Sequence, residues 1–218
     1  MKKIYLHPLP IRIWHWVNAG GFIFLILTGA QIRGIIKLFS SVETAVEIHS
    51  WLGFILLANY CIWLFYYFLT VKIKIYIPPL HHPVEFAKKA LRQAKFYGFG
   101  IMVGDQNPHH STPDNKFNPM QQVSYLMIMA LLIPVQIITG LFLWDPKLFS
   151  PIVTPVGIQI VSAVHVFLWI FFSAFIIVHF YLATLGHTTW AHIIAMFTGY
   201  EEEHEEGHGH GEEHGHSH

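Results

Sequence analysis

Four long apolar stretches, each free of Asp, Glu, Lys and Arg in its interior, constrain this chain of 218 residues more than any other feature. A helix needs about twenty apolar residues to cross the roughly 30 Å hydrocarbon core of a membrane. The stretches run from about Arg12 to Ile32, from Ile48 to Val71, from Val123 to Trp144 and from Val156 to about Leu185. The sequence therefore predicts an all-α membrane protein, a bundle of four transmembrane helices.

Basic residues are distributed unevenly between the segments that connect these spans. With the N-terminus inside the cell, ten of the 13 Lys and Arg residues fall in cytoplasmic segments. The three in outer loops are Arg33, Lys37 and Lys147. Because cytoplasmic loops carry the excess of Lys and Arg in multi-pass proteins, we expect both termini in the cytoplasm and the chain in the cytoplasmic (inner) membrane of a bacterial or archaeal cell.

The cytoplasmic loop 72–122 is the one long connection between spans. Pro83 is followed by apolar residues on one helix face and basic residues on the other, which favours a short interfacial helix on anionic lipid over a solvated loop. The basic residues are Lys88, Lys89, Arg92 and Lys95.

Residues 201–218 form a segment of different composition from the membrane domain, residues 1–200. They hold seven of the 13 acidic residues, with six histidines, four glycines and one serine. Such a segment can bury no apolar core, and we expect a disordered tail. Its His and Glu side chains could bind nickel or zinc loosely, but a solvated tail is the simpler interpretation.

Among Asp, Glu, Lys, Arg and His, the apolar interiors of the spans contain only His15, His49, His165 and His179. The topology places His49 and His165 nearer the outer face and His15 and His179 nearer the cytoplasm. His165 and His179 are fourteen residues apart, so both project from one helix face, about 21 Å apart along the axis. Two neutral imidazoles from facing helices can hold a haem iron from both sides. We therefore predict two haem b groups, with His49 and His165 as iron ligands of one and His15 and His179 of the other.

Other interpretations of these histidines remain open. A single intramembrane histidine often does no more than hydrogen-bond a neighbour, although four at two matched depths fit that role poorly. A histidine-lined transporter of divalent metal ions is the alternative from another functional class. Such paths usually combine His with Asp or Glu, and Glu47, at the mouth of the second span, is the only acid nearby.

Small residues are expected where a porphyrin approaches the backbone. Gly29 follows His15 by fourteen residues, the interval that also separates His165 from His179, which predicts contact between Gly29 and the outer haem. The segments Leu27-Thr28-Gly29 and Ile138-Thr139-Gly140 echo each other, but the match is too short to indicate a duplication.

Four motifs carry a resemblance to a known family. They are the segment from Pro10 to Asn18, the Lys116-to-Gln122 entry to the third span, its Thr139-Gly140 exit and the His165/His179 interval. Over about residues 5–200 the chain resembles the four-helix di-haem cytochrome b subunits of respiratory formate dehydrogenases, nickel-iron hydrogenases and thiosulfate or polysulfide reductases.

The resemblance implies a quinone site beside the cytoplasmic haem, with menaquinone or ubiquinone as the diffusible substrate. The family's Lys-aromatic-Asn-x-x-Gln motif matches Lys116, Asn118 and Gln121. Asn118 and Gln121 could donate to quinone carbonyls, and they suit a helix start equally well. Arg12 and Arg33, at opposite ends of the first span, are candidates for pairing with haem propionates, or are ordinary positive flanks.

These features predict an electron-transfer subunit with no substrate-catalytic centre of its own. Cys61 is the single cysteine, so the chain alone holds no disulfide, Cys-rich zinc site, iron–sulfur cluster or covalent c-type haem. We expect a periplasm-facing iron–sulfur or multihaem cytochrome c partner with its own catalytic subunit, contact with membrane lipid, and no nucleic acid. Electrons are expected to reach the quinone pool near the cytoplasmic side; quinol oxidation feeding a periplasmic reductase uses the same residues and stays open.

Overall fold

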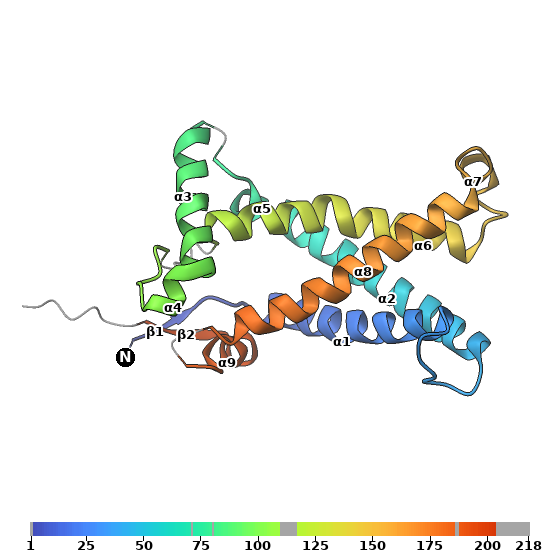
Figure 1. Ribbon diagram of the computed structural model, residues 1–218, viewed down its shortest axis with the longest axis horizontal. Helices are drawn as coiled ribbons and strands as arrows, with labels where there is room; N and C mark the ends of the chain where they lie inside the picture. The colour runs from blue at the N-terminus through green and yellow to red at the C-terminus, as the bar shows by residue number, and fades with distance from the viewer. Residues whose placement is uncertain (1, 71, 80, 110–116, 186–187, 204–218) are drawn as a thin grey trace, which may run out of the picture.

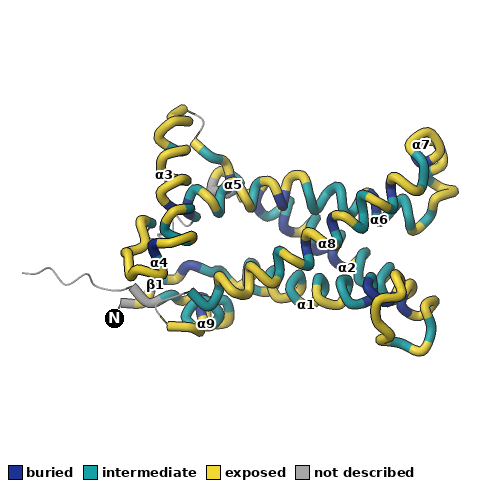
Figure 2. Tube along the Cα trace, viewed as in Figure 1, coloured by how far each residue is buried: buried dark blue, intermediate teal, exposed yellow. Residues whose placement is uncertain are grey.

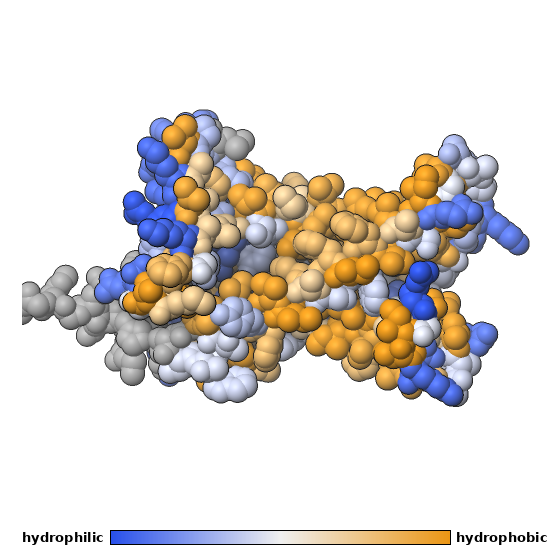
Figure 3. Space-filling view, in the orientation of Figure 1, coloured by the Kyte–Doolittle hydropathy of each residue, from blue (hydrophilic) through white to orange (hydrophobic). Residues whose placement is uncertain are grey.

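Four long helices form the body of the molecule (Figure 1). The computed structural model describes residues 2–70, 72–79, 81–109, 117–185 and 188–203. The spans are α1 (Leu9–Ile32), α2 (Val42–Leu69), the continuous run of α5 (Pro119–Met127), η3 (Ile128–Leu132) and α6 (Ile133–Trp144), and α8 (Ile158–Ala183). Each is long and apolar enough to cross a membrane. Figure 3 shows an apolar middle section with polar residues gathered at both ends.

Shorter elements lie at the two ends of the bundle (Figure 1). One end, called here the sheet end, holds β1 (Lys2–Tyr5), η1 (Lys72–Tyr76), α3 (Pro83–Lys95), η2 (Phe96–Gly100), α4 (Ile101–Val103), α9 (Ala191–Thr198) and β2 (Tyr200–Glu203). The other, the α7 end, holds α7 (Ser150–Val156) and the loop between α1 and α2.

Three spans begin earlier than the apolar stretches predicted, α1 at Leu9 rather than Arg12, and α2 and α5 show the physical reason. Helix α2 starts at Val42 rather than Ile48 because the Ser41 hydroxyl accepts a hydrogen bond of 3.1 Å from the Thr44 amide. Helix α5 starts at Pro119 rather than Val123 because Asn118 and Gln121 form a reciprocal capping box. Counting uncharged residues misses both starts, since a helix also includes the polar residues of its first turn.

A wide turn, η3, interrupts the third span just before Pro134. Proline lacks the backbone N–H that would continue the ladder, and the Ile133 amide instead bonds the Ile128 carbonyl five residues back. The Tyr60 hydroxyl of α2 donates to the Met129 carbonyl in this turn, at 2.8 Å. The interruption therefore joins the third span to α2.

The spans pack mainly as two pairs, α1 with α2 and α6 with α8. A hydrophobic core that extends from mid-height toward the sheet end joins the pairs; its buried members are Trp63, Tyr67, Tyr76, Ile128, Met129, Leu168 and Phe172. Elsewhere most positions are exposed or half-buried (Figure 2). Because a bilayer covers the outward faces of such helices, the bundle needs internal packing only along a narrow seam.

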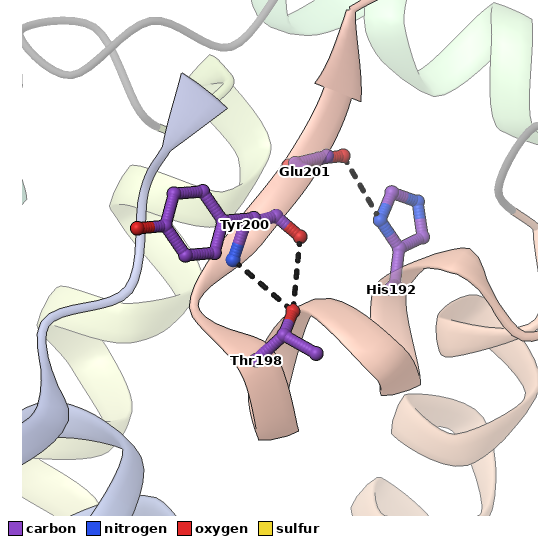
Figure 4. Close-up of polar contacts among 4 residues, drawn as sticks. All are labelled: His192, Thr198, Tyr200 and Glu201. Atoms are coloured by element: carbon purple, nitrogen blue, oxygen red, sulfur yellow. Dashed lines mark hydrogen bonds and ion pairs between the residues drawn. The ribbon is translucent and has the colours of Figure 1, made fainter. Parts of the chain in front are cut away.

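A two-stranded antiparallel ribbon joins the segments on either side of the four spans. In β1 and β2, Lys2 lies opposite Glu203 and Tyr5 opposite Tyr200. The Glu201 carboxylate also approaches His192 Nδ1 of α9, at 3.2 Å (Figure 4). The prediction of a disordered segment over 201–218 is therefore wrong for Glu201–Glu203, because their backbone pairs with that of β1 in the ribbon. Residues 204–218 lie outside the described part of the chain.

Helix α3 lies across the sheet end, roughly perpendicular to the spans (Figure 1). This orientation would place it in the plane of a membrane surface, as the sequence predicted for an interfacial helix. Val84 and Leu91 are exposed and available to lipid, and Gln93 on the opposite side is buried and donates to Asn107 Oδ1. Helix α3 is therefore anchored to the following loop by one buried amide.

Candidate cofactor sites

The structure brings the four intramembrane histidines together in two pairs. The sheet-end pair is His15 of α1 and His179 of α8, with ring centroids 6.2 Å apart. The α7-end pair is His49 of α2 and His165 of α8, with ring centroids 6.4 Å apart. These are the pairs that the sequence predicts.

Both separations suit an iron held between two imidazoles. A metal bound at about 2 Å by the near nitrogen of each ring puts the two ring centroids roughly 6 Å apart. The donor set is also appropriate, because two neutral imidazoles are a common axial pair for b-type haem. The residues present therefore fit the group.

A threonine contacts each histidine of the α7-end pair. Thr28 Oγ1 of α1 lies 2.8 Å from His49 Nδ1. Thr139 Oγ1 of α6 lies 3.0 Å from His165 Nδ1. In each case the ring is held at Nδ1, so Nε2 is the nitrogen that a ligand would use; at His165 the ligand would displace the Gln136 amide, whose Nε2 lies 3.2 Å away.

A glycine follows each of these threonines and leaves room for the imidazole. A Cβ added at Gly140 would lie 3.2 Å from Cε1 of His165. One added at Gly29 would lie 3.6 Å from Cε1 of His49 and 3.2 Å from Nε1 of Trp169. Gly29 thus lies beside a predicted iron ligand, and the Thr28-Gly29 and Thr139-Gly140 echo marks two equivalent histidine cradles.

A buried glutamine fixes the loop that leads from α1 to α2. Gln31 is 4% exposed; its Nε2 donates to the Phe39 and Ser41 carbonyls, each at 3.0 Å. Its Oε1 accepts from the Leu38 and Phe39 amides at 3.0 and 2.7 Å. This loop sets where α2 begins, so Gln31 indirectly places His49 opposite Thr28.

Aromatic rings surround the sheet-end pair. His15 meets Trp16 edge-on, with ring centroids 5.1 Å apart, and His179 stacks on Phe175 at 5.7 Å. Trp14, beside His15, donates from Nε1 to the Asn59 carbonyl at 3.1 Å, and Asn59 Nδ2 donates back to the Trp14 carbonyl at 3.1 Å. This reciprocal pair fixes α1 against α2 at the level of His15.

The two arginines of the first span lie at opposite ends, as expected from the sequence. Arg12 donates from Nη1 to the Phe197 carbonyl of α9, while its buried Nε has no hydrogen-bond partner among the described residues. Arg33 borders a cleft at the α7 end together with Gln159 and Ser162. Arg12 thus binds the last turn of α9 and retains a donor for an anionic group; propionate binding stays a prediction for both arginines.

The predicted quinone-binding residues lie at the sheet end, where the third span begins. Asn118 is 2% exposed and accepts from the Gln121 amide at 2.9 Å, while Gln121 Oε1 accepts from the Asn118 amide at 3.0 Å. Asn118 Nδ2 donates to the Tyr97 hydroxyl at 3.1 Å. Burial raises the pKa of Tyr97, against an opposing effect of its hydrogen bonds to Gln93 and Asn118, so the hydroxyl remains neutral. Lys116 lies outside the described residues.

The helix cap therefore uses Oδ1 and the backbone N–H of Asn118 and Oε1 of Gln121. In the described contacts, Gln121 Nε2 is not used by the cap, and its N–H groups are the donors that this motif has left for a ligand. The assignment of Asn118 and Gln121 to a quinone stays a prediction.

Sequence reasoning did not assign Thr28, Thr139 and Gln31 to the site. Their signal was weak, because an isolated polar residue in an apolar span is usually hydrogen-bonded within its own helix. The repeated Thr-Gly was the one clue, and it becomes meaningful only when each pair is seen beside a histidine from another helix.

Four apolar spans with facing histidine pairs define a membrane-bound b-type cytochrome, a class of electron-transport proteins. The chain belongs to the prokaryotic cytochrome b561 family, which matches residues 6–199. The family membership favours haem over the alternative of a metal-ion transporter. In the described part of the chain, no group of three or more His, Cys, Asp and Glu side chains is placed to hold a metal ion.

Three relatives are similar over most of their length. A putative cytochrome, YdhU, of Escherichia coli is 34% identical over 203 residues, covering 91% of this chain and 75% of the relative. A probable Ni/Fe-hydrogenase B-type cytochrome subunit of Rhizobium leguminosarum is 25% identical, covering 84% and 81%. A protein of the same description in Bradyrhizobium diazoefficiens is 25% identical, covering 83% and 77%. No solved structure matches the chain significantly.

Proposed function

We propose that this chain is the membrane-anchor cytochrome b subunit of a respiratory oxidoreductase complex and that it binds two haem b groups. The axial ligands are His49 and His165 at the α7 end and His15 and His179 at the sheet end. The observation that carries the proposal is the pair of ring separations, 6.4 and 6.2 Å. Each bound haem supplies a one-electron carrier at its level of the membrane.

Packed side chains separate the two histidine pairs and exclude water from the space between them. On α8, Leu168 and Phe172 lie between His165 and His179 and are 4% and 3% exposed. Phe22 of α1 meets Phe172 with ring centroids 5.4 Å apart. This packed layer excludes water between the levels, which favours electron movement without accompanying proton leakage.

The orientation that we propose places the sheet end in the cytoplasm. The basic residues of α3 and of the long loop lie at this end, which supports the assignment. The α7 end then faces the periplasm and would receive a partner that carries an iron–sulfur or multihaem cytochrome c subunit with its catalytic subunit. Two relatives named as Ni/Fe-hydrogenase cytochrome subunits support a hydrogenase-type partner.

Quinone reduction at the sheet end completes the proposal, with menaquinone or ubiquinone as substrate. The Gln121 amide offers N–H donors to a quinone carbonyl, and the wet cytoplasmic face provides protons. The same residues would serve quinol oxidation if the partner were a reductase, so the direction of electron flow depends on the potentials of the haems and of the partner.

The test of haem binding uses the purified full-length protein. A reduced-minus-oxidised spectrum with a pyridine haemochrome assay should give two haem b per chain, and a redox titration should resolve two one-electron steps. A colourless protein that accumulates zinc or nickel in vesicles would instead support the transporter.

The quinone assignment is tested by Gln121→Glu, measured on the intact complex. Glutamate preserves the capping box, because its carboxylate still accepts from the Asn118 amide, but it loses the N–H donors. We expect a KM for quinone raised about tenfold, the effect of losing one good hydrogen bond of about 1.4 kcal/mol, with haem content unchanged. An unchanged KM would remove Gln121 from the site.

A further inference from the structure

We propose that Thr28 and Thr139 are positioning residues for the α7-end pair. Each holds its histidine in the tautomer that presents an unprotonated Nε2, and each lowers the reduction potential of the haem bound there. The inference deepens the proposed function and rests on haem ligation by His49 and His165.

The direction of each Thr–His hydrogen bond follows from where the hydroxyl hydrogen goes. Thr28 Oγ1 donates to the Phe24 carbonyl of its own helix, at 2.8 Å. With its single hydrogen on that carbonyl, the hydroxyl accepts from His49 Nδ1, and this is the direction that iron binding through Nε2 would require. The ring hydrogen of His49 is therefore on Nδ1, and Nε2 carries the lone pair.

Thr139 makes the same arrangement in the other helix pair. With its hydroxyl hydrogen on the Val135 carbonyl, 2.8 Å away, Thr139 Oγ1 accepts from His165 Nδ1, as iron binding through Nε2 would require. An independent contact agrees: Gln136 Nε2 lies 3.2 Å from His165 Nε2. An amide nitrogen only donates, so His165 Nε2 must be the acceptor, and the hydrogen again lies on Nδ1.

Burial strengthens the hydrogen bonds that Thr28 and Thr139 make to the two histidines. Thr28 is 0% and Thr139 is 8% exposed, so water does not compete for either hydroxyl. A hydrogen bond in such surroundings is stronger than the same bond in water. Each Thr-Gly unit therefore fixes both the position and the protonation of an imidazole on the neighbouring helix.

The chemical consequence concerns the electron density on the ligand nitrogen. An acceptor at Nδ1–H makes an imidazole a stronger donor through Nε2. A stronger donor stabilises ferric iron more than ferrous iron, so the reduction potential falls. Removing the acceptor should raise the potential of the α7-end haem and leave the sheet-end haem unchanged.

The experiment replaces each threonine in the full-length protein by Val, Cys or Ser. Valine keeps the shape and removes the acceptor, cysteine offers a weak acceptor, and serine retains the hydroxyl. The readouts are haem per chain and the two midpoint potentials. Ser173→Ala is the matched control, because the Ser173 hydroxyl makes a similar bond to its own helix, to the Trp169 carbonyl at 2.7 Å.

We expect Thr28→Val and Thr139→Val each to raise the midpoint potential of the α7-end haem and to leave the other unchanged. The shift in the double variant should be about the sum of the two single shifts. The Leu25 backbone carbonyl can also accept from the His49 ring, so Thr28→Val should weaken the hold on the ring rather than release it. The Cys variants should shift less, and the Ser variants and Ser173→Ala should match the unmodified chain.

Three results would overturn the inference. They are Val variants with both potentials unchanged, equal shifts of both haems, and Ser variants that shift as far as Val. A Val variant that fails to assemble would lose the sheet-end haem too. In that case the Cys and Ser variants test the inference, which requires a raised potential in the Cys variant and an unchanged one in the Ser variant. Failure of the proposed function looks different, because the unmodified protein would then lack the α7-end haem altogether.

Discussion

The two histidine pairs have nearly the same ring separation but are held by different forces. At the α7 end, hydroxyl and amide groups bond the rings and the adjoining loop, as Thr28, Thr139 and Gln31 show. At the sheet end, the rings of His15 and His179 lie against the aromatic side chains of Trp16 and Phe175.

This difference predicts different tolerances to substitution. Hydrogen bonds fix a tautomer and a direction, whereas aromatic contacts fix the plane of a ring. The α7 end should therefore respond sharply to the loss of single polar atoms, and the sheet end should respond gradually to changes in side-chain volume.

The largest effect should come from removing one histidine of each pair. His165→Ala should abolish the α7-end haem and His179→Ala the sheet-end haem, because one imidazole leaves the iron without its second axial ligand. Haem per chain should fall from two to one in each variant, with a different redox step missing from the titration. Full haem content in both variants would contradict the pairing.

A smaller but still large effect is expected from Gln31→Leu. The substitution leaves the Leu38 and Phe39 amides without acceptors, at a cost of about 2 to 3 kcal/mol of stability. Because Gln31 fixes the loop that leads into α2, the α7-end haem should become partly occupied and the sheet-end haem should remain full. Thermal unfolding in detergent measures the loss of stability, and haem quantification measures the occupancy of each site. Equal loss of the two haems would contradict the proposed difference between the two ends.

Gly140→Ala should have a moderate effect. Its Cβ would lie 3.2 Å from His165 Cε1, so the ring must shift by a few tenths of an ångström, at a cost of about 1 kcal/mol. Gly20→Ala is the matched control, since a Cβ at that position meets nothing within 4 Å. We expect a changed α7-end haem spectrum in the first variant only.

The smallest effect should be that of Phe175→Leu at the sheet end. The stacked ring is lost, which weakens the hold on His179 by less than about 1.5 kcal/mol. We expect full haem content and a small change confined to the sheet-end redox step. Phe180→Leu, at a position 60% exposed, should change neither step.

Much of this arrangement could be predicted because a bilayer imposes strict rules. Apolar length predicts the four spans, and the energetic cost of placing histidines in a membrane marks the four residues of the two pairs. Spacing along α8 also predicted two levels. Each of these arguments needs only one helix at a time.

The remaining features depend on contacts between helices. Nothing in the sequence of α1 indicates that the Thr28 hydroxyl meets a ring of α2, or that the Gln31 amide closes a loop. Likewise, the pairing of Glu201 with β1 joins segments nearly 200 positions apart. The composition of residues 201–218 alone predicts a solvated tail and gives no sign of this pairing. Such contacts become visible only once the helices have been assembled in space.

The ribbon of β1 and β2 also bears on how the protein is made. Between these strands the chain crosses the bilayer four times, and only an even number of crossings returns it to its starting side. Gly199, with φ +89°, packs so closely that an added Cβ would lie 2.6 Å from Tyr5 Cε2, so the two segments close tightly once they meet. The ribbon can therefore form only when the helices between its strands have crossed an even number of times, so its closure excludes a chain in which a single helix is still outside the lipid.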